Sequence, residues 1–422
     1  MTSLFLHADI NNCYASIFRI FNPELTGKPI IVLSNNDGSI IARSQEAKDL
    51  GIKMGQPFFE AKAIIDKHQI QVYSSNYPLF HDLSTRFHNT LGTFSPNQEI
   101  YSIDEGFLDL GNFYNTNLQQ YGRTIKQTVW KWLGLPICVG IAPTKTLAKL
   151  ANRIAKKSAK ANGVLVLNTP DHITSALKII DVGDVWGIGR QYAIKLRNFG
   201  IYTAWDLSKV TDAFAKKHLT IVGLRIVKEL RGEACADLEI EPPAKKGICT
   251  SRSFGQPVTT LNLLEEAVAT YMTRSAYKLR KQKSRCSQLS VFLETNPFKE
   301  NEAQYNNCKT IQLPVPTNST LELINYALIA LRAIYREGYK YKKAGVLLDD
   351  ISPATAVQGN IFDTIDRGKH LDLMQTLDLL TRKLGTGIVK VAKEGIEKSW
   401  KMRQDYGTPC YTTRMEDILV VR

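Results

Sequence analysis

The chain has 422 residues and carries 54 Lys and Arg against 40 Asp and Glu, which gives a formal net charge of +14. The length suits about two to four domains, and a hydrophobic share of 44% is typical of a globular protein rather than a disordered one. The sequence has no apolar run of roughly 18 residues, so we expect no membrane-spanning helix. Residues 1–9 lack the basic segment of a signal peptide, so we expect none there.

Charge and cysteine content indicate where such a chain works. A pI near 9.3 is typical of proteins that bind nucleic acid or an anionic membrane. No long basic helix with an aromatic face is evident, which favours nucleic acid; a basic surface without a polyanion partner is the alternative. The seven cysteines are scattered, form no Cys-x-x-Cys pair and do not cluster with His, so we expect buried thiols in a cytoplasmic protein and no zinc site.

The first elements are predicted from short apolar runs. Residues 4–8 form such a run, which ends at Asp9 and predicts a buried strand. Asn11 or Asn12 can cap the helix that follows, before Pro23 and Gly27 end it. Residues 29–33 and 39–43 flank an Asp-Gly pair, which predicts a β-hairpin. A helix near Ser44 completes what we interpret as a small insert.

The rest of the chain divides into three further sections. Residues 99–110 predict two strands that meet near Asp104, and they are followed by a strand at 136–141 and a helix at 144–161. Residues 181–232 predict helices broken by glycines, and 242–247 predict a linker. An α+β section then covers 248–350, with strands near 288–295 and 309–314 and helices near 263–281 and 321–337, before a mixed tail.

Three carboxylates stand beside apolar strands, where an unpaired acid is costly: Asp9, Asp104 and Glu105. Acids crowded at strand ends repel one another unless a hard cation joins them, and oxygen ligands suit Mg²⁺. Two such ions can hold the attacking and leaving oxygens of a phosphoryl transfer. Adjacent residues of a straight strand face opposite ways, so Asp104 and Glu105 can share a site only if the chain turns there. The alternative is a polar turn at Asp104 and a helix cap at Asp9.

Several linked motifs resemble Y-family DNA polymerases. Residues 9–16 (DINNCYAS) and 101–105 (YSIDE) resemble the polymerase palm. The hairpin residues 35–38 (NNDG), together with 41–43 (IAR) and 46–48 (EAK), resemble the UmuC group in particular, and the similarity continues through 251–255 (SRSFG) to 411–414 (YTTR). UmuC is the catalytic subunit of DNA polymerase V.

The resemblance implies an α+β fold with the right-hand architecture of a polymerase. The palm, of the ferredoxin-like type, would cover 1–23 and 76–168, and the fingers 24–75. A helical thumb with a helix-hairpin-helix would cover 169–241, an α+β little finger 242–350, and a C-terminal partner-binding tail 351–422.

The resemblance also implies roles for residues of the active site. Asp9, Asp104, Glu105 and the carbonyl of Ile10 would hold two Mg²⁺ ions, with Asp104 and Glu105 catalytic. Tyr14 would be the steric gate that excludes a ribose 2′-OH, although Cys13 replaces the usual Phe beside it. The nucleotide-binding residues would be Lys48, Lys156, Gln45 and Tyr14; at position 45 many relatives have Tyr.

Two acid-free basic runs suggest faces that follow a phosphate backbone, although such runs are often only solvated. They consist of Lys145, Lys149, Arg153, Lys156, Lys157 and Lys160, and of Arg274, Lys278, Arg280, Lys281, Lys283 and Arg285. Gly187 and Gly189 resemble a helix-hairpin-helix, whose backbone N–H groups can approach a phosphate. A simple helix turn is the alternative there.

The function implied is error-prone translesion DNA synthesis in the SOS response, with primer-template DNA and deoxynucleoside triphosphates as substrates. A cleaved UmuD dimer and RecA would be partners, and Gln358, Ile361 and Phe362 resemble a peptide that binds the sliding clamp. The alternatives are a catalytically inactive DNA-binding repair scaffold and a nucleotidyl cyclase, which shares a palm-like metal site. Intact carboxylates argue against the first, and the thumb-like hairpin argues against the second.

Overall fold

The computed structural model of the chain describes residues 3–111, 113, 116–355, 359–385 and 387–420. These residues form two compact units. Unit 1 comprises 1–34, 38–242 and 406–422, and unit 2 comprises 35–37 and 243–405. The change between units near residue 242 falls within the segment that the sequence marks as a linker.

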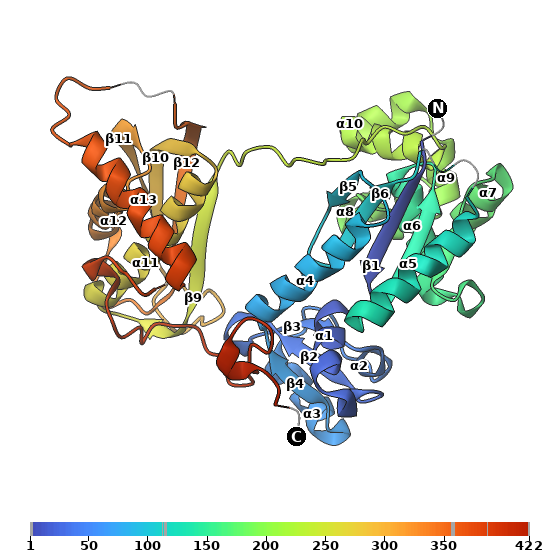
Figure 1. Cartoon of the computed structure of the whole chain (residues 1–422), viewed down its shortest axis with the longest axis horizontal. Helices are drawn as coiled ribbons and strands as arrows, with labels where there is room; N and C mark the ends of the chain where they lie inside the picture. The colour runs from blue at the N-terminus through green and yellow to red at the C-terminus, as the bar shows by residue number, and fades with distance from the viewer. Residues whose placement is uncertain (1–2, 112, 114–115, 356–358, 386, 421–422) are drawn as a thin grey trace. The chain divides into compact units, whose positions relative to one another are not determined.

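A five-stranded sheet in the order β5-β6-β1-β7-β8 lies at the centre of unit 1 (Figure 1). Its strands are β1 (Phe5–Ile10), β5 (Gln98–Ile100), β6 (Glu105–Asp109), β7 (Ile137–Ala142) and β8 (Val164–Val166). The helices α1 (Cys13–Phe21), α4 (Tyr77–Gly92), α5 (Leu118–Leu133) and α6 (Lys145–Lys157) belong to the same part of the chain. Strand β1 pairs antiparallel with β6 and β7, so the first strand of the sequence lies at the middle of the sheet.

Strand β1 divides its side chains between two cores because successive side chains of a strand face opposite ways. Leu6, Ala8 and Ile10 pack with residues of α4 and α5, whereas Phe5 packs with residues of α6. His7 and Asp9 therefore share the face that α6 covers. The helix lies very close to the sheet: a Cβ on Gly140 of β7 would come within 2.2 Å of a backbone oxygen of α6.

The segment predicted to form the fingers, residues 24–75, contains a small sheet in the order β3-β2-β4. Its elements are β2 (Ile30–Leu33), β3 (Ile40–Arg43), α2 (Gln45–Asp49), α3 (Phe58–His68) and β4 (Gln71–Ser74). The predicted hairpin is confirmed, because β2 and β3 pair antiparallel. The positive φ values that reverse the chain fall on Asn36 and Asp37, at 60° and 52°, rather than on Gly38.

Four helices after the palm form the predicted helical section: α7 (Pro170–Ile179), α8 (Arg190–Asn198), α9 (Ala204–Lys209) and α10 (Asp212–Leu230). Their buried residues join those of α6 in one core, so this section packs against α6. Within the described residues, the longest apolar stretches of helix fall short of what crossing a bilayer requires.

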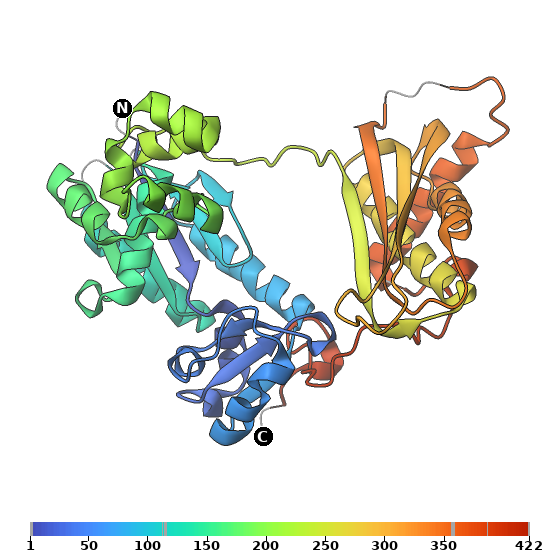
Figure 2. The same cartoon turned by 180° about the vertical axis from the view of Figure 1, so that it is seen from behind.

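Unit 2 is built on an antiparallel sheet in the order β11-β10-β12-β9 (Figure 2). Its elements are β9 (Ile248–Val258), α11 (Leu261–Lys281), β10 (Ser284–Thr295), β11 (Asn306–Thr317), α12 (Thr320–Ile334), β12 (Tyr341–Pro353) and α13 (Arg367–Leu384). Residues of α11, α12 and the sheet share one core.

The structure differs from the expectation of a single tail after residue 350. Helix α13 packs within unit 2, where Met374 is buried and its sulfur accepts a hydrogen bond from Thr320 N at 3.3 Å. Residues 406–422 instead belong to unit 1. The segment that the sequence presents as one tail is therefore shared between the two units.

Candidate active site

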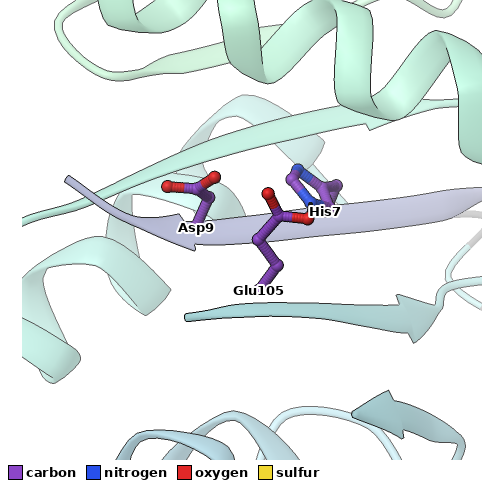
Figure 3. Close-up of side chains that lie close together, drawn as sticks. All are labelled: His7, Asp9 and Glu105. Carbon is purple, nitrogen blue, oxygen red and sulfur yellow. Dashed lines mark ion pairs between the residues drawn. The ribbon is translucent and has the colours of Figure 1, made fainter. Parts of the chain in front are cut away.

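Two of the three predicted carboxylates lie directly opposite each other on neighbouring strands. Asp9 of β1 pairs in register with Glu105 of β6, so both side chains lie on the face covered by α6. His7 lies on the same face, two residues before Asp9. The ligand atoms of His7, Asp9 and Glu105 all lie within 4.8 Å of one another. Figure 3 shows the Glu105 carboxylate between Asp9 and His7.

A turn between β5 and β6 places Asp104 at the edge of this group. Residues 101–104 form the turn, closed by hydrogen bonds from Tyr101 N and Ser102 N to Glu105 O, and β6 begins at Glu105. Ser102 Oγ donates to Asp104 Oδ1 at 2.7 Å, and Ile10 N donates to Asp104 O at 2.9 Å. The chain thus turns where the sequence required it to turn, directly before Glu105.

Helix α6 brings a row of lysines over the carboxylates. Lys149 pairs with Glu105 at 2.5 Å, and Lys156 pairs with Asp9. Lys145, at the start of the same row, pairs with Glu99. These lysines are spaced four and seven residues apart, so they lie on one face of the helix. Asn152, between them, anchors α6 by donating to His7 O and Cys138 O at 3.2 and 2.7 Å.

Burial and these cations set the charge of the site. Burial raises the pKa of Asp9 to about 7, although Lys156 opposes the shift, and Glu105 and Asp104 add to it. Burial also disfavours the charge on Glu105, but the nearby His7 ring and a hydrogen bond from Lys149 hold its pKa well below the usual value. Burial lowers the pKa of His7, which therefore favours the neutral imidazole. Two neighbouring carboxylates thus have pKa values shifted in opposite directions.

His7 was not predicted from the sequence. It is 2% exposed, its Nε2 lies 3.5 Å from Glu105 Oε2, and among the described residues neither ring nitrogen has a hydrogen-bond partner. Its spacing of two residues from Asp9 on a strand was the available signal, because that spacing places both side chains on one face. Carboxylate oxygens and a neutral imidazole are ligands that divalent cations accept, so the residues fit a metal site.

Tyr14, the predicted gate, lies on α1 beside the palm. Its ring stacks on Phe80 of α4, with centroids 4.1 Å apart and an angle of 7° between the planes. Half-burial raises the pKa of Tyr14 to about 12, so the phenol stays neutral.

Asn12 precedes α1 as predicted, but its side chain does not cap the helix, so the predicted side-chain cap is wrong. Its Oδ1 instead accepts from Lys48 Nζ at 2.6 Å.

The predicted nucleotide-binding cations gather near Asp9. Burial and the charges of Arg43 and Lys156 lower the pKa of Lys48, which indicates that these three positive groups lie close together. Arg43 was not predicted; it ends β3 and donates to Ile52 O. Gln45 is exposed on α2 and donates to Asp49 Oδ1 at 2.8 Å. Lys48 and Lys156 thus lie near the carboxylates, whereas the Gln45 amide is paired within its own helix.

The first basic run is not the solvent-facing stripe that its sequence suggests. Lys145 is 4% exposed and bonded to Glu99, and Lys149 and Lys156 face the carboxylates. Arg153 forms an ion pair with Asp184 of the thumb. These side chains form ion pairs with acids from distant parts of the sequence, and DNA contacts by Lys145, Lys149 and Arg153 stay a prediction. Lys157 and Lys160 remain exposed.

The thumb glycines take different roles. Gly187 has a φ of +86°, and a Cβ there would meet Ile226 at 2.5 Å, so the turn needs glycine. Gly189 precedes α8 and faces open space. Trp186, directly before Gly187, donates to Tyr101 Oη at 3.1 Å, which joins this helical section to the turn that carries Asp104.

The second basic run divides in two. Burial together with Lys245, Arg252 and Arg274 lowers the pKa of exposed Lys278, so positive charges gather here on unit 2. Lys281 is also exposed. Arg280 instead forms a bidentate ion pair with Asp378 of α13 at 2.8 and 2.7 Å. This ion pair joins α11 to α13, and the DNA contact of Arg280 stays a prediction.

The predicted clamp peptide follows β12. Ile361 is 93% exposed and Phe362 is 83% exposed, so neither packs against the domain that carries it. Gln358 lies outside the described residues. The two apolar anchors are therefore free for a partner.

Comparison with known proteins agrees with this geometry. Residues 8–153 match the impB/mucB/samB family, residues 245–361 match the C-terminal domain of that family, and residues 372–421 match a domain of unknown function. Protein UmuC of Salmonella typhimurium LT2 is 43% identical over 422 residues, covering 99% of this chain and all of the relative. Protein ImpB of Salmonella typhimurium is 42% identical over 423 residues, with the same coverage.

Solved structures show the same fold. A Y-family DNA polymerase chimera of Dbh and Dpo4 matches with a TM-score of 0.67 at 22% identity, over 83% of this chain and 99% of that one. DinB from Sulfolobus solfataricus matches with a TM-score of 0.53 at 23% identity, over the same shares. The predicted α+β right-hand fold is confirmed, and the chain belongs to the UmuC-type, or impB/mucB/samB, family of Y-family DNA polymerases.

Proposed function

We propose that this chain is an error-prone translesion DNA polymerase of the SOS response, which extends a primer 3′-OH on a template by two-metal nucleotidyl transfer. The observation that carries the proposal is the register of Asp9 against Glu105, with Asp104 on the adjoining turn. Membership of the UmuC family supports it independently. A bare scaffold would not need three acids held at one end of a palm sheet.

The cofactor that we propose is a pair of Mg²⁺ ions held by Asp9, Asp104, Glu105 and the carbonyl of Ile10. When bound, the ions supply positive charge to the attacking and leaving oxygens of the transfer. The fit rests on the carboxylates that share one sheet face and on the raised pKa of Asp9, which reflects burial that Lys156 offsets only in part. A ring nitrogen of His7 adds a possible metal ligand, whereas the prediction from the sequence included only oxygen ligands.

The protein groups have distinct tasks in this proposal. Lys48, Lys156 and Arg43 bind and orient the triphosphate, whose negative charge must be held during in-line transfer. Tyr14, fixed by its stack on Phe80, closes the space beside the sugar C2′. Lys149 keeps Glu105 ionised until the metal binds, because it bonds directly to that carboxylate.

The proposed partners follow from the family and from two surfaces of unit 2. The cluster of Lys245, Arg252, Arg274 and Lys278 would lie along the primer-template backbone. The exposed pair Ile361 and Phe362 would enter a pocket of the sliding clamp, with Gln358 fixing the register. A cleaved UmuD dimer and RecA are proposed from the resemblance to UmuC, and the cytoplasm is proposed as the place of action.

Primer extension tests the proposal. The chain should extend a primer on undamaged DNA and across an abasic site, measured with and without activated RecA and cleaved UmuD. Asp104→Asn should abolish extension while DNA binding, followed by fluorescence anisotropy, stays within about twofold. DNA binding without extension on either template, with or without the partner proteins, would favour the scaffold. Robust extension by Asp104→Asn would remove that acid from the site.

A further inference from the structure

The last described part of the chain lies against the fingers and palm. Residues 406–417, here called the C-terminal strap, belong to unit 1, although the preceding residues 243–405 belong to unit 2. In Figures 1 and 2 the red C-terminal segment lies beside the region of β4 and α1. The strap falls within the domain of unknown function, so its role is not given by the family match.

Two hydrogen bonds, one of them to a side chain, attach the start of the strap to the end of β4. Ser74 N donates to Tyr406 O at 2.9 Å, and Tyr406 N donates to Ser74 Oγ at 3.1 Å. The Tyr406 ring also meets Phe58 of α3 edge-on, with centroids 5.7 Å apart. The start of the strap is therefore fixed to the end of β4 and to α3.

Asn76 holds the next residues of the strap. Its Nδ2 donates to Thr408 O, Thr408 Oγ1 and Pro409 O at 3.3, 3.0 and 3.0 Å. Its Oδ1 meanwhile caps α4 by accepting from Leu79 N at 3.2 Å. One buried side chain thus binds the strap with its amide hydrogens and starts helix α4 with its oxygen.

Tyr411 joins the strap to the other helix of this region. Its ring stacks on Phe21, the last residue of α1, with centroids 4.7 Å apart and an angle of 7°. Cys410 N donates to Asp417 Oδ2 at 2.7 Å, which closes the strap into a compact turn around this tyrosine. The strap consequently contacts both α1 and the start of α4.

The same two helices place the gate. Tyr14 is on α1, and it stacks on Phe80 of α4. Phe18 of α1 packs edge-on against Phe80 at 5.6 Å and stacks on Tyr73 of β4 at 4.5 Å. These ring contacts therefore run from the gate to Tyr73, which directly precedes Ser74, the residue of β4 that bonds to the strap.

We propose that the C-terminal strap is an intramolecular brace: it anchors the carboxyl end of the chain to unit 1 and fixes α1 against α4, so that Tyr14 keeps its position. The chain then passes between the units at Pro242–Pro243 and at Asp405–Tyr406, in addition to the short excursion of residues 35–37 into unit 2. The effect on the sugar gate rests on the proposed polymerase function, whereas the seat of the strap does not.

Two variants of the full chain loosen the strap from opposite sides. Asn76→Asp keeps the cap, since Asp and Asn are equally good N-caps, but it removes the donors and sets a carboxylate against the oxygens of Thr408 and Pro409. Tyr411→Ala removes the stack on Phe21. The matched control is Asn117→Asp, which makes the same change at the cap of α5, where Asn117 accepts from Gln120 N at 3.1 Å.

Hydrogen–deuterium exchange of the full chain measures the brace without any need for polymerase activity. In both strap variants the amides of Ser74 and Tyr406 should exchange at least about tenfold faster, and the amides at the end of α1 should also exchange faster, while the control stays unchanged. Unprotected strap amides in the unaltered chain would overturn the proposal, and so would exchange at the end of α1 that neither variant alters.

Ribonucleotide discrimination then tests the consequence for the gate. Both strap variants should raise the ratio of ribonucleotide to deoxynucleotide incorporation by roughly threefold or more, with the Asn117→Asp control unchanged. Faster exchange with unaltered discrimination would overturn the link to Tyr14. If the chain made no DNA at all, the polymerase proposal would fail, and the exchange experiment would still decide on the brace.

Discussion

Lys156 at the end of α6 forms an ion pair with Asp9 at the end of β1, although 147 positions of sequence separate them. The pair joins a residue expected to bind phosphate to a residue expected to bind metal. It exists because α6 packs closely on the central sheet, where Gly140 leaves room for its backbone. A nucleotide that binds at this site would meet the cation and the acid together.

The pKa of Asp9 predicts a pH dependence of metal binding. Its pKa in the folded chain, about 7, is above the ordinary 3.8, so below pH 7 a metal must displace a proton from Asp9. The apparent affinity for Mg²⁺ or Mn²⁺ should rise about tenfold per pH unit up to about pH 7 and then level off. Calorimetry in two buffers of different ionisation enthalpy measures the proton release.

The raised pKa of Asp9 also makes the stability of the metal-free chain depend on pH. Because the folded pKa of Asp9 is raised, its contribution to stability is fully present below about pH 4 and is lost as pH rises through about 7. Asp9→Asn should therefore flatten both the metal profile and the metal-free stability between these values. A metal affinity that is constant from pH 5 to pH 8 would contradict the prediction.

Tyr14→Ala should relax sugar selection. Removing the ring that stacks on Phe80 opens space beside the sugar C2′, so incorporation of ribonucleotides should rise by at least about tenfold relative to deoxynucleotides. Single-turnover kinetics with both nucleotides gives the ratio. Deoxynucleotide incorporation should persist because the carboxylates are unaltered, and an unchanged ratio would make Tyr14 an ordinary packing residue.

The pair of Lys145 and Glu99 predicts a loss of stability rather than of DNA affinity. Lys145→Met leaves Glu99, which is 4% exposed, without its cation, and breaking such a buried pair costs about 3–5 kcal/mol. Chemical unfolding measures the loss, and Glu99→Gln in the same chain should restore much of it. Lys157→Met, at an exposed position of α6, is the control and should change little. A variant with normal stability but weaker DNA binding would restore the original DNA-contact prediction for Lys145.

Neighbouring cations of α11 should behave differently. Lys278→Gln should weaken primer-template binding for all sequences and flatten the log–log salt slope by roughly 0.7–0.9, since one phosphate contact is lost. Arg280→Gln should leave that slope unchanged but lower stability by about 2 kcal/mol, because it leaves Asp378 without its bidentate partner. Binding titrations at several salt concentrations distinguish the two, and equal slopes for both variants would contradict the assignment.

Changing Ile361 and Phe362 to Ala should abolish clamp-stimulated synthesis and leave synthesis without the clamp nearly intact. These side chains are 93% and 83% exposed, so their removal should not lower the melting temperature. Primer extension with and without the clamp, followed by a thermal melt, measures both effects. Full clamp stimulation in the variant would exclude the peptide, and a lower melting temperature would show that the residues pack on their own domain.

Local patterns in the sequence determined the elements and the acids of the site. The short apolar run before Asp9 predicts a buried strand, and β1 indeed covers this run and extends through Ile10. The hairpin of β2 and β3 was predictable because turn residues separate two β-rich runs. The linker was predictable because proline, glycine and charged residues occur together there. The carboxylates were noticeable because acids beside apolar strands are costly unless they are paired.

Tertiary structure alone decided which charges meet. The basic run of α6 has no acid near it in sequence, and yet Lys145, Lys149 and Lys156 are bonded to acids of the sheet. Charge pairing acts through space, so a pattern on one helix cannot reveal what the opposing face carries. For the same reason the sequence did not predict that His7 lies beside Glu105 or that Asp378 pairs with Arg280. The contact of Tyr411 with Phe21 was not predicted either, because it depends on where the chain folds back and not on a local preference.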